Sequence, residues 1–261
     1  MSGKVIAVAN QKGGTGKTAT TLSLGVALAR HGKKILLVDT DPQGDLTKSL
    51  GWRDPDSMEI TIGNHLEAAI FDQDLDGHVG ILNHDEGVDL MPANIRLADI
   101  ETGLFMAMDR ESVLKDWIEP LKDEYDYILI DCMPTLGIIP INVFVAADSV
   151  IIPVSAEYLP AVGMTGLIKS INKVRKKLNK NLNVEGILLT LFDRRTKLAR
   201  EIEDTVRNDY GQMFPVFETK IPRAVSAAES SATGTSIFSY DGKGRAAKAY
   251  NDLASEVIAH G

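Results

Sequence analysis

Short apolar segments and longer segments with helical periodicity alternate along nearly the whole chain. Strands of a parallel sheet appear as continuous apolar runs, because helices cover both faces of such a sheet. The pattern therefore predicts an α/β fold with a mostly parallel, twisted sheet flanked by helices on both faces. The predicted strands are residues 5–9, 34–38, 88–91, 127–130, 149–154 and 184–190. The predicted helices are residues 18–30, 96–108, 112–121, 162–178, 198–210 and 244–259.

The chain is expected to form one domain. Its 261 residues contain no linker rich in Pro, Gly or Ser, no internal repeat and no low-complexity stretch, so we expect a single domain over residues 1–261. Residues 54–87 are polar and have the weakest periodicity. His65 and His78 lie in this segment and His84 lies near its end. The five histidines lack the ligand spacing of a metal site, and we expect them at the surface.

Composition excludes several classes of protein. Hydrophobic residues make up 44% and charged residues 25%, which excludes disordered and collagen-like chains. The single cysteine, Cys132, cannot form an internal disulfide, and this fits a reducing compartment. The longest apolar stretch, residues 136–147, is shorter than the roughly 20 residues of a membrane span. The N-terminal apolar run is too short for a signal peptide, so a cytoplasmic location is expected.

Charge is distributed unevenly along the chain. The net charge is −8, which by itself argues against nucleic acid as a partner. Residues 169–200, however, contain ten lysines and arginines and only two acidic residues, Glu185 and Asp193. This local excess of positive charge needs an explanation, and a solvated charged face is the alternative to a binding surface for an anionic partner.

The first predicted strand leads directly into the sequence NQKGGTGKT, residues 10–18, and then into a helical pattern. A glycine-rich turn between a strand and a helix directs backbone N–H groups and the positive end of the helix toward one point, which suits a polyphosphate. Lys17 would reach the β- and γ-phosphates and the Thr18 hydroxyl would ligate Mg²⁺. The standard phosphate-loop pattern is not met, because Gln11 stands where its first glycine is required.

This string resembles the deviant phosphate loop of the ParA-type partition ATPases, which are relatives of MinD and of the nitrogenase iron protein. The resemblance implies that the early lysine, Lys12, reaches across an ATP-sandwiched homodimer to the phosphates bound by the other subunit. It also implies that Gly14 faces the partner's loop, where no side chain fits. The residues expected to bind the nucleotide here are Lys12, Gly13, Gly14, Thr15, Gly16, Lys17, Thr18 and Ala19.

Two acidic motifs extend the resemblance. The segment LLVDTDPQGD, residues 36–45, is similar to the family's switch, in which the second aspartate positions the attacking water. This implies that Asp41 has that catalytic role and that Asp39 faces the water shell of Mg²⁺. The segment YILIDCMP, residues 127–134, resembles the second acidic motif, so Asp131 would bond a water bound to Mg²⁺. Met133 stands where relatives often have a proline.

A third segment, residues 219–225 with the sequence TKIPRAV, resembles the stretch that lies beside the adenine in this family. Pro222 would form an apolar wall for the base. Ala224 takes the position where relatives often carry asparagine, so a side-chain contact from that position is absent. The resemblance as a whole runs from Lys4 to about His260, and the phosphate loop is its most specific part.

Two groups of basic residues are candidates for binding DNA. Arg195 and Arg223 match positions that bind DNA without sequence preference in the family's dimers, and Lys197 lies beside the first of them. The alternative is the predicted helix at residues 162–178, on which lysines recur at helical spacing, with a further lysine after its end: Lys169, Lys173, Lys176, Lys177 and Lys180. No aromatic residues interleave these charges, which favours contacts with the duplex backbone over stacking on single strands.

The resemblance implies an ATP-dependent DNA-segregation ATPase whose slow hydrolysis is stimulated by a ParB-like centromere-binding partner. It implies a nucleoid-associated protein without the N-terminal helix-turn-helix of longer relatives, because the phosphate loop begins at residue 10. A relative that positions a protein cargo or transfer machinery remains an alternative. A MinD-like membrane switch is less favoured, because the chain lacks a basic amphipathic tail, and stable membrane association is not expected. A single cysteine does not fit an iron–sulfur carrier.

Overall fold

The computed structural model describes residues 2–104, 107–135, 137–157 and 161–260. Within these residues, one seven-stranded sheet has the order β3-β4-β2-β5-β1-β6-β7. All neighbouring strands are parallel except β3 and β4, which are antiparallel. This confirms the predicted mostly parallel sheet. The strands are β1 Lys4–Val8, β2 Ile35–Thr40, β3 Leu82–His84, β4 Val88–Met91, β5 Tyr127–Cys132, β6 Ser149–Ser155 and β7 Asn183–Thr190.

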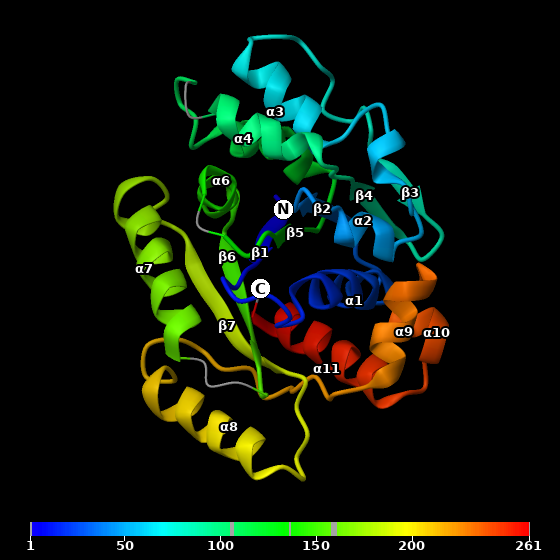
Figure 1. Ribbon diagram of the computed structural model, residues 1–261, viewed down its shortest axis with the longest axis vertical. Helices are drawn as coiled ribbons and strands as arrows, with labels where there is room; N and C mark the ends of the chain where they lie inside the picture. The colour runs from blue at the N-terminus through cyan, green and yellow to red at the C-terminus, as the bar shows by residue number, and fades with distance from the viewer. Residues whose placement is uncertain (1, 105–106, 136, 158–160, 261) are drawn as a thin grey trace.

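Helices cover both faces of the sheet (Figure 1). One face packs against α1 Lys17–Arg30, α2 Asp45–Ser49, α10 Ile237–Asp241 and α11 Arg245–His260, and α9 Val225–Thr233 lies beside α2 and α10. The other face packs against α3 Ile62–Ile70, α4 Arg96–Leu104, α5 Val113–Ile118, α6 Ile138–Ala146, α7 Ala161–Lys177 and α8 Lys197–Asp209. Two short 3₁₀ helices, η1 Pro55–Ser57 and η2 Glu119–Asp123, complete the described elements.

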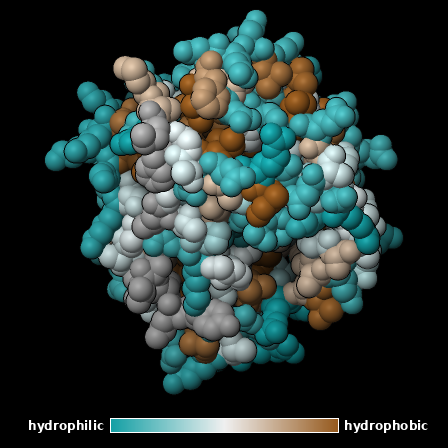
Figure 2. Space-filling view, turned by 45° about the horizontal axis from the view of Figure 1, so that its top comes forward, coloured by the Kyte–Doolittle hydropathy of each residue, from teal (hydrophilic) through white to brown (hydrophobic). Residues whose placement is uncertain are grey.

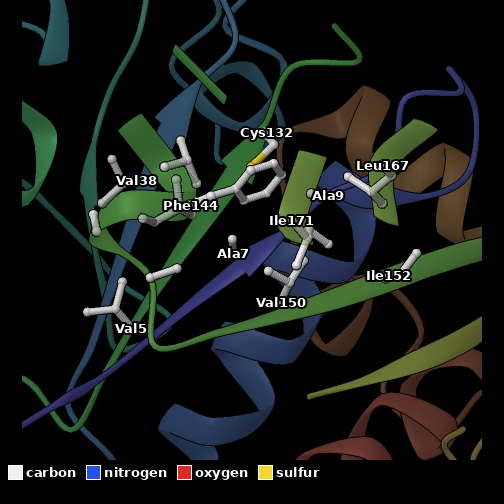
Figure 3. Close-up of a cluster of buried hydrophobic side chains, with 14 of the residues drawn as sticks. Val5, Ala7, Ala9, Val38, Cys132, Phe144, Val150, Ile152, Leu167 and Ile171 are labelled. Atoms are coloured by element: carbon white, nitrogen blue, oxygen red, sulfur yellow. The ribbon is translucent and has the colours of Figure 1, made fainter. Parts of the chain in front are cut away.

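The side chains of β1 alternate between two hydrophobic cores. Val5 and Ala7 belong to the core beneath α6 and α7, whereas Ile6 and Val8 belong to the core beneath α1 and α11. Figure 3 shows Val5, Ala7 and Ala9 on the same side of the sheet as Phe144 of α6 and Leu167 and Ile171 of α7. All four strand residues of β1 from Val5 to Val8 are fully buried. A central strand covered on both faces explains why the segment is apolar at every position.

The segment of residues 54–87 is more ordered than its polarity suggested. It contains η1, α3 and β3, and Ile62 and Leu66 of α3 are buried in the core. His65 is 3% exposed and its Nε2 lies 2.7 Å from the carbonyl oxygen of Val79, so the expectation that all five histidines lie at the surface is wrong for His65. A neutral imidazole with one hydrogen-bonded nitrogen packs as an aromatic residue, and His65 contacts the ring of Trp117.

Residues 137–147 of the long apolar stretch form α6 and its C-cap, and Leu136 lies outside the described residues. None of the helices in the described part of the chain is long and apolar enough to cross a membrane. The helix is apolar on all sides because it is buried, which removes the periodicity by which a half-exposed helix is recognised. Figure 2 shows one face of the molecule, where hydrophilic residues predominate and hydrophobic residues form small separate groups.

Asn142 is a buried polar residue of α6 whose side-chain amide is hydrogen-bonded to backbone groups. Its side chain is fully buried, and its Oδ1 accepts a hydrogen bond from the backbone N–H of Leu114 at 3.2 Å. Its Nδ2 donates to the carbonyl oxygens of Arg110 at 2.7 Å and Ile138 at 3.1 Å. The amide therefore joins α6 to the start of α5 and satisfies backbone groups that water does not reach.

Replacing Asn142 with leucine should lower the free energy of unfolding by about 1–3 kcal/mol, because backbone groups of the α5 segment lose their buried partners. Urea unfolding followed by circular dichroism measures this change. Asn172, an exposed residue of α7, provides the matched control, and Asn172→Leu should change stability by less than about 0.5 kcal/mol. Equal stability of the two variants would contradict a structural role for the Asn142 amide.

Candidate functional site

The glycine-rich loop lies at the carboxyl end of β1 and is fixed by hydrogen bonds to residues of β6 and β7. The Nδ2 of Asn10 donates to the carbonyl oxygen of Pro153 in β6 at 2.7 Å, and its Oδ1 accepts from the backbone N–H of Lys12 at 3.0 Å. The hydroxyl of Thr190, at the end of β7, donates to the carbonyl oxygen of Thr15 at 2.8 Å. Thr15 itself is buried. These bonds position the loop before any ligand binds.

The loop and the start of α1 form a polyphosphate cradle. Gly14 and Gly16 have φ angles of 71° and 83°, values that strain residues with a side chain. Gly16 is the N-cap of α1 and supplies no side-chain hydrogen bond, so first-turn N–H groups of α1 are available to an anion. Thr18 and Ala19, both half-buried, lie in this first turn.

The two lysines of the loop lie in different environments. Lys17 is buried, and its Nζ lies 3.4 Å from the carbonyl oxygen of Lys12, so the ammonium group sits beneath the loop. Lys12 is exposed, as are Gly13 and Gly14. A Cβ atom added at Gly13 or Gly14 would meet no atom within 4 Å. The outer face of the loop is therefore open, and Lys12 lies on this open face.

Two buried carboxylates stand beside the cradle. Asp39 in β2 and Asp131 in β5 are direct neighbours in the parallel register, and β5 also pairs with β1, which leads into the loop. The Oδ2 of Asp131 accepts a hydrogen bond from the Thr18 hydroxyl at 2.7 Å. The Oδ2 of Asp39 accepts from the backbone N–H and the hydroxyl of Thr47, at 3.0 and 2.8 Å. The sheet thus places Asp39 next to Asp131, which bonds Thr18, and the role of these three residues at Mg²⁺ stays a prediction.

The electrostatics of this pair favour a bound cation. Burial raises the pKa of Asp39 to about 7. Burial also raises the pKa of Asp131 well above its usual value, and the neighbouring charge of Asp39 raises it further. Two adjacent carboxylates in a dry site are unfavourable as anions unless a cation compensates them. Carboxylate and hydroxyl oxygens are the donors that Mg²⁺ prefers, so the residues present fit a magnesium site.

Asp41 lies two residues beyond Asp39, at the turn that leads into α2. Its side chain is half-buried, and its Oδ1 accepts a hydrogen bond from the backbone N–H of Gln43 at 3.0 Å. Its own backbone N–H donates to the Oδ1 of Asp39 at 3.1 Å. The position of Asp41 is therefore coupled to the buried carboxylate beside the phosphate loop.

Three residues that hold the site were not predicted from the sequence. Asn10 stands inside the recognised motif, and its amide fastens the loop to β6. Thr190 ends a predicted strand, and nothing local to it indicates that its hydroxyl reaches the loop 175 residues away. Thr47 lies in α2, which the sequence pattern did not predict, and both of its hydrogen bonds to Asp39 depend on the fold.

The segment at residues 219–225 runs beside the end of β7. Pro222 is half-buried and pairs with Phe192, and the backbone N–H of Arg223 donates to the carbonyl oxygen of Phe192 at 3.3 Å. Ala224 is half-buried and is the N-cap of α9. The roles of Pro222 and Ala224 beside an adenine stay predictions.

The fold brings Arg195 and Arg223 together in one groove. The groove has a volume of about 720 Å³ and is lined in part by six basic residues: Arg194, Arg195, Lys220, Arg223, Arg245 and Lys248. Lys197 is exposed and pairs with Glu201 at 3.2 Å. The candidate lysines of residues 169–180 lie on α7 and just beyond its end, and are exposed there. The two candidate DNA surfaces thus belong to different elements.

Two of the arginines that line the groove, Arg195 and Arg223, are hydrogen-bonded to carboxylates. Arg195 bonds Asp193 through two atoms, with Nε–Oδ1 at 3.0 Å and Nη2–Oδ2 at 2.8 Å, and these bonds lower the pKa of Asp193 to about 2. The Nη1 of Arg223 donates to the Oε1 of Glu157 at 2.6 Å. A phosphate that binds either guanidinium therefore competes with a carboxylate for its N–H donors.

Comparison with known proteins gives a consistent picture. Residues 3–184 match a family model described as an AAA domain. The chain is 41% identical to the sporulation initiation inhibitor protein Soj of Bacillus subtilis, over 99% of this chain and all of that protein. It is 36% identical to the chromosome partitioning protein ParA of Caulobacter vibrioides, over 98% of this chain and 94% of that one.

Solved structures with the same fold include ligand-bound ones. A Mycobacterium smegmatis protein described as cobyrinic acid a,c-diamide synthase, with a bound ATP analogue and magnesium, superposes with a TM-score of 0.86 and 36% identity, over 99% of this chain and 95% of that one. The cell division ATPase MinD of Pyrococcus furiosus superposes with a TM-score of 0.74 and 26% identity, over 99% of this chain and all of that one.

Proposed function

This chain belongs to the ParA/Soj family of partition ATPases, and on that basis we propose that it is an ATP-dependent DNA-segregation ATPase working as a single domain. ATP and Mg²⁺ join two copies into a sandwich dimer that holds duplex DNA without sequence preference. A ParB-like centromere-binding partner then stimulates slow hydrolysis and release. The observation that carries the proposal is the pair of lysines on one phosphate loop, one buried beneath it and one on its open face.

Within one protomer, different residues bind the triphosphate, the magnesium ion and the adenine. Lys17 and the N–H groups of the loop, from Gly13 to Thr18, hold the triphosphate, with Ala19 in the same helical turn. Thr18, Asp39 and Asp131 hold Mg²⁺, directly or through water. The bound ion supplies positive charge against the phosphates. Pro222 and Ala224 flank the adenine.

A second copy of the chain accounts for the open face of the loop. A Cβ atom added at Gly13 or Gly14 would meet no atom within 4 Å, so no packing within the monomer excludes a side chain at these two positions. Two such loops placed face to face leave no space for side chains, and Lys12 then reaches the phosphates bound by the partner. An additional cation at the transferred phosphate stabilises the charge of the transition state.

The surface charges favour DNA as the ligand of the groove, with duplex phosphates as the recognised chemistry. One weakly cationic patch per monomer binds little at physiological salt, but a dimer presents two patches to one duplex. This makes DNA binding depend on ATP and places the protein on the nucleoid in the cytoplasm. A relative that positions a protein cargo would share the nucleotide site and lack this DNA binding.

Lys12→Ala should bind ATP and stay monomeric, because the cation that crosses the interface is missing. Size-exclusion chromatography with light scattering, with ATP and Mg²⁺, measures this. Lys115→Ala removes an exposed lysine of α5, is the charge-matched control and should dimerise like the unchanged protein. Dimerisation of the Lys12 variant to the same extent would rule out the cross-subunit role.

Asp41→Ala should bind ATP and dimerise but hydrolyse it about 10²–10⁴-fold more slowly, because a group that orients the attacking water typically contributes that much. Phosphate release at saturating ATP gives the turnover number. Asp45→Ala removes an exposed carboxylate four residues further on and should hydrolyse ATP normally. An unchanged turnover number for the Asp41 variant would remove this residue from the mechanism.

Arg195→Ala/Arg223→Ala should lose ATP-dependent binding to unrelated duplexes, and binding by the unchanged protein should fall steeply with salt as counterions are released. Gel shifts with ATP and with ADP test this, and Lys197→Ala should have a smaller effect because Lys197 lies outside the residues that line the groove. Equal binding with ADP, or full binding by the double variant, would favour the cargo-positioning alternative.

A further inference from the structure

Glu157 forms an ion pair with Arg223, which lines the basic groove, and the residue before Glu157 is hydrogen-bonded to a strand that contacts the phosphate loop. It follows the end of β6 by two residues, and its carboxylate accepts the 2.6 Å hydrogen bond from Arg223, which lies 66 residues away. We infer that Glu157 is a positioning residue that holds Arg223 away from DNA until ATP binds, so that the affinity for DNA responds to the nucleotide. This inference rests on the proposed function and adds its regulation.

A short chain of hydrogen bonds links this ion pair to the loop. The hydroxyl of Thr190 donates to the carbonyl oxygen of Thr15 in the loop at 2.8 Å. The carbonyl oxygen of Thr190 accepts from the backbone N–H of Ala156 at 2.9 Å, and Ala156 directly precedes Glu157. One residue of β7 thus contacts both the phosphate loop and the segment that carries the carboxylate.

The arginine is held by the same end of β7. Phe192 lies two residues beyond Thr190, and its carbonyl oxygen accepts the backbone N–H of Arg223 at 3.3 Å. Its own N–H donates to the carbonyl oxygen of Ile221 at 3.0 Å. Both partners of the ion pair are therefore attached to residues 190–192. We expect a bound triphosphate to shift the loop at Thr15 and, through Thr190, the backbone of Ala156, and so to weaken the ion pair between Glu157 and Arg223.

The ion pair of Arg195 with Asp193 lies within one loop and, among the residues that the structure describes, is not linked by such hydrogen bonds to the phosphate loop. Asp193 and Arg195 lie in one loop, and the Oδ1 of Asp193 also accepts the backbone N–H of Arg195 at 3.1 Å. This pair is local and should compete with phosphate equally in every nucleotide state. Glu157 should compete only when ATP is absent. The two carboxylates therefore provide a matched pair for an experiment, since replacing either one removes one negative charge that is paired with an arginine of the groove.

The experiment measures the Kd for a fluorescent duplex by anisotropy at about 50 mM salt, without nucleotide and with ATP. An exposed ion pair changes such an equilibrium by at most about fivefold. Glu157→Gln should bind DNA up to about fivefold more tightly without nucleotide and unchanged with ATP. Asp193→Asn should tighten binding by a similar factor in both states, so its ratio of the two Kd values stays that of the unchanged protein.

Two further variants separate the contact from the charge. Glu157→Asp keeps the negative charge but is shorter by one methylene, so it should act in the same direction as Glu157→Gln. In an Arg223→Gln background, Glu157→Gln should have no effect on DNA binding. Thermal melting of each variant checks that the fold is retained, and Glu157→Asp carries the test if Glu157→Gln is destabilised.

The outcomes are distinguishable. An equal gain from Glu157→Gln in both nucleotide states, or a gain that persists in the Arg223→Gln background, overturns the inference and leaves the proposed function intact. Normal ATP-dependent binding by Arg223→Gln removes Arg223 from the DNA site and overturns the inference with it. If the unchanged protein binds duplex equally with and without ATP, the proposed function itself fails and the inference falls with it.

Discussion

The close approach of two buried carboxylates, Asp39 and Asp131, is the constraint on which the rest of the site depends. They are neighbours across β2 and β5, where burial and mutual repulsion both disfavour their charged forms. Hydrogen bonds from Thr18, Thr21 and Thr47 offset part of this cost. The nearby charge of Lys17 offsets a further part for Asp131. A bound Mg²⁺ would compensate both carboxylates, and this favours binding of the ion at this site.

The parallel sheet is what allows this arrangement. The carboxyl ends of β1, β2 and β5 lie at one edge, and the phosphate loop, Asp39 and Asp131 occur at or just beyond these ends. Helices on both faces bury the strands and keep water away from the carboxylates. Polar residues inside this core, such as Asn142 and His65, are each hydrogen-bonded to backbone groups. Because these buried polar groups are hydrogen-bonded, they do not destabilise the packed core.

The distribution of charge separates binding of nucleotide from binding of DNA. The nucleotide site contains buried charges whose energies change greatly with the ligand, whereas the groove contains exposed ion pairs of small individual energy. Arg195 and Arg223 are each paired with a carboxylate, Asp193 and Glu157, in a chain of net charge −8, so the groove proposed to bind DNA carries little unpaired positive charge at these two residues. A modest change at several such pairs, doubled in a dimer, is sufficient for a reversible interaction.

The amino-acid sequence by itself determined the sheet strands with strong apolar runs, the phosphate loop with α1, and the two acidic motifs that contain Asp39 and Asp131. These features are encoded by contiguous residues, so their signal is local. Periodicity missed α6, which is apolar all round, and α3, whose core-facing residues include His65. Only the tertiary structure decided the partners of Thr47, Thr190 and Arg223. Their bonds join segments that are distant in sequence or not predicted as elements, and no local pattern specifies which side chains a fold brings within 3 Å.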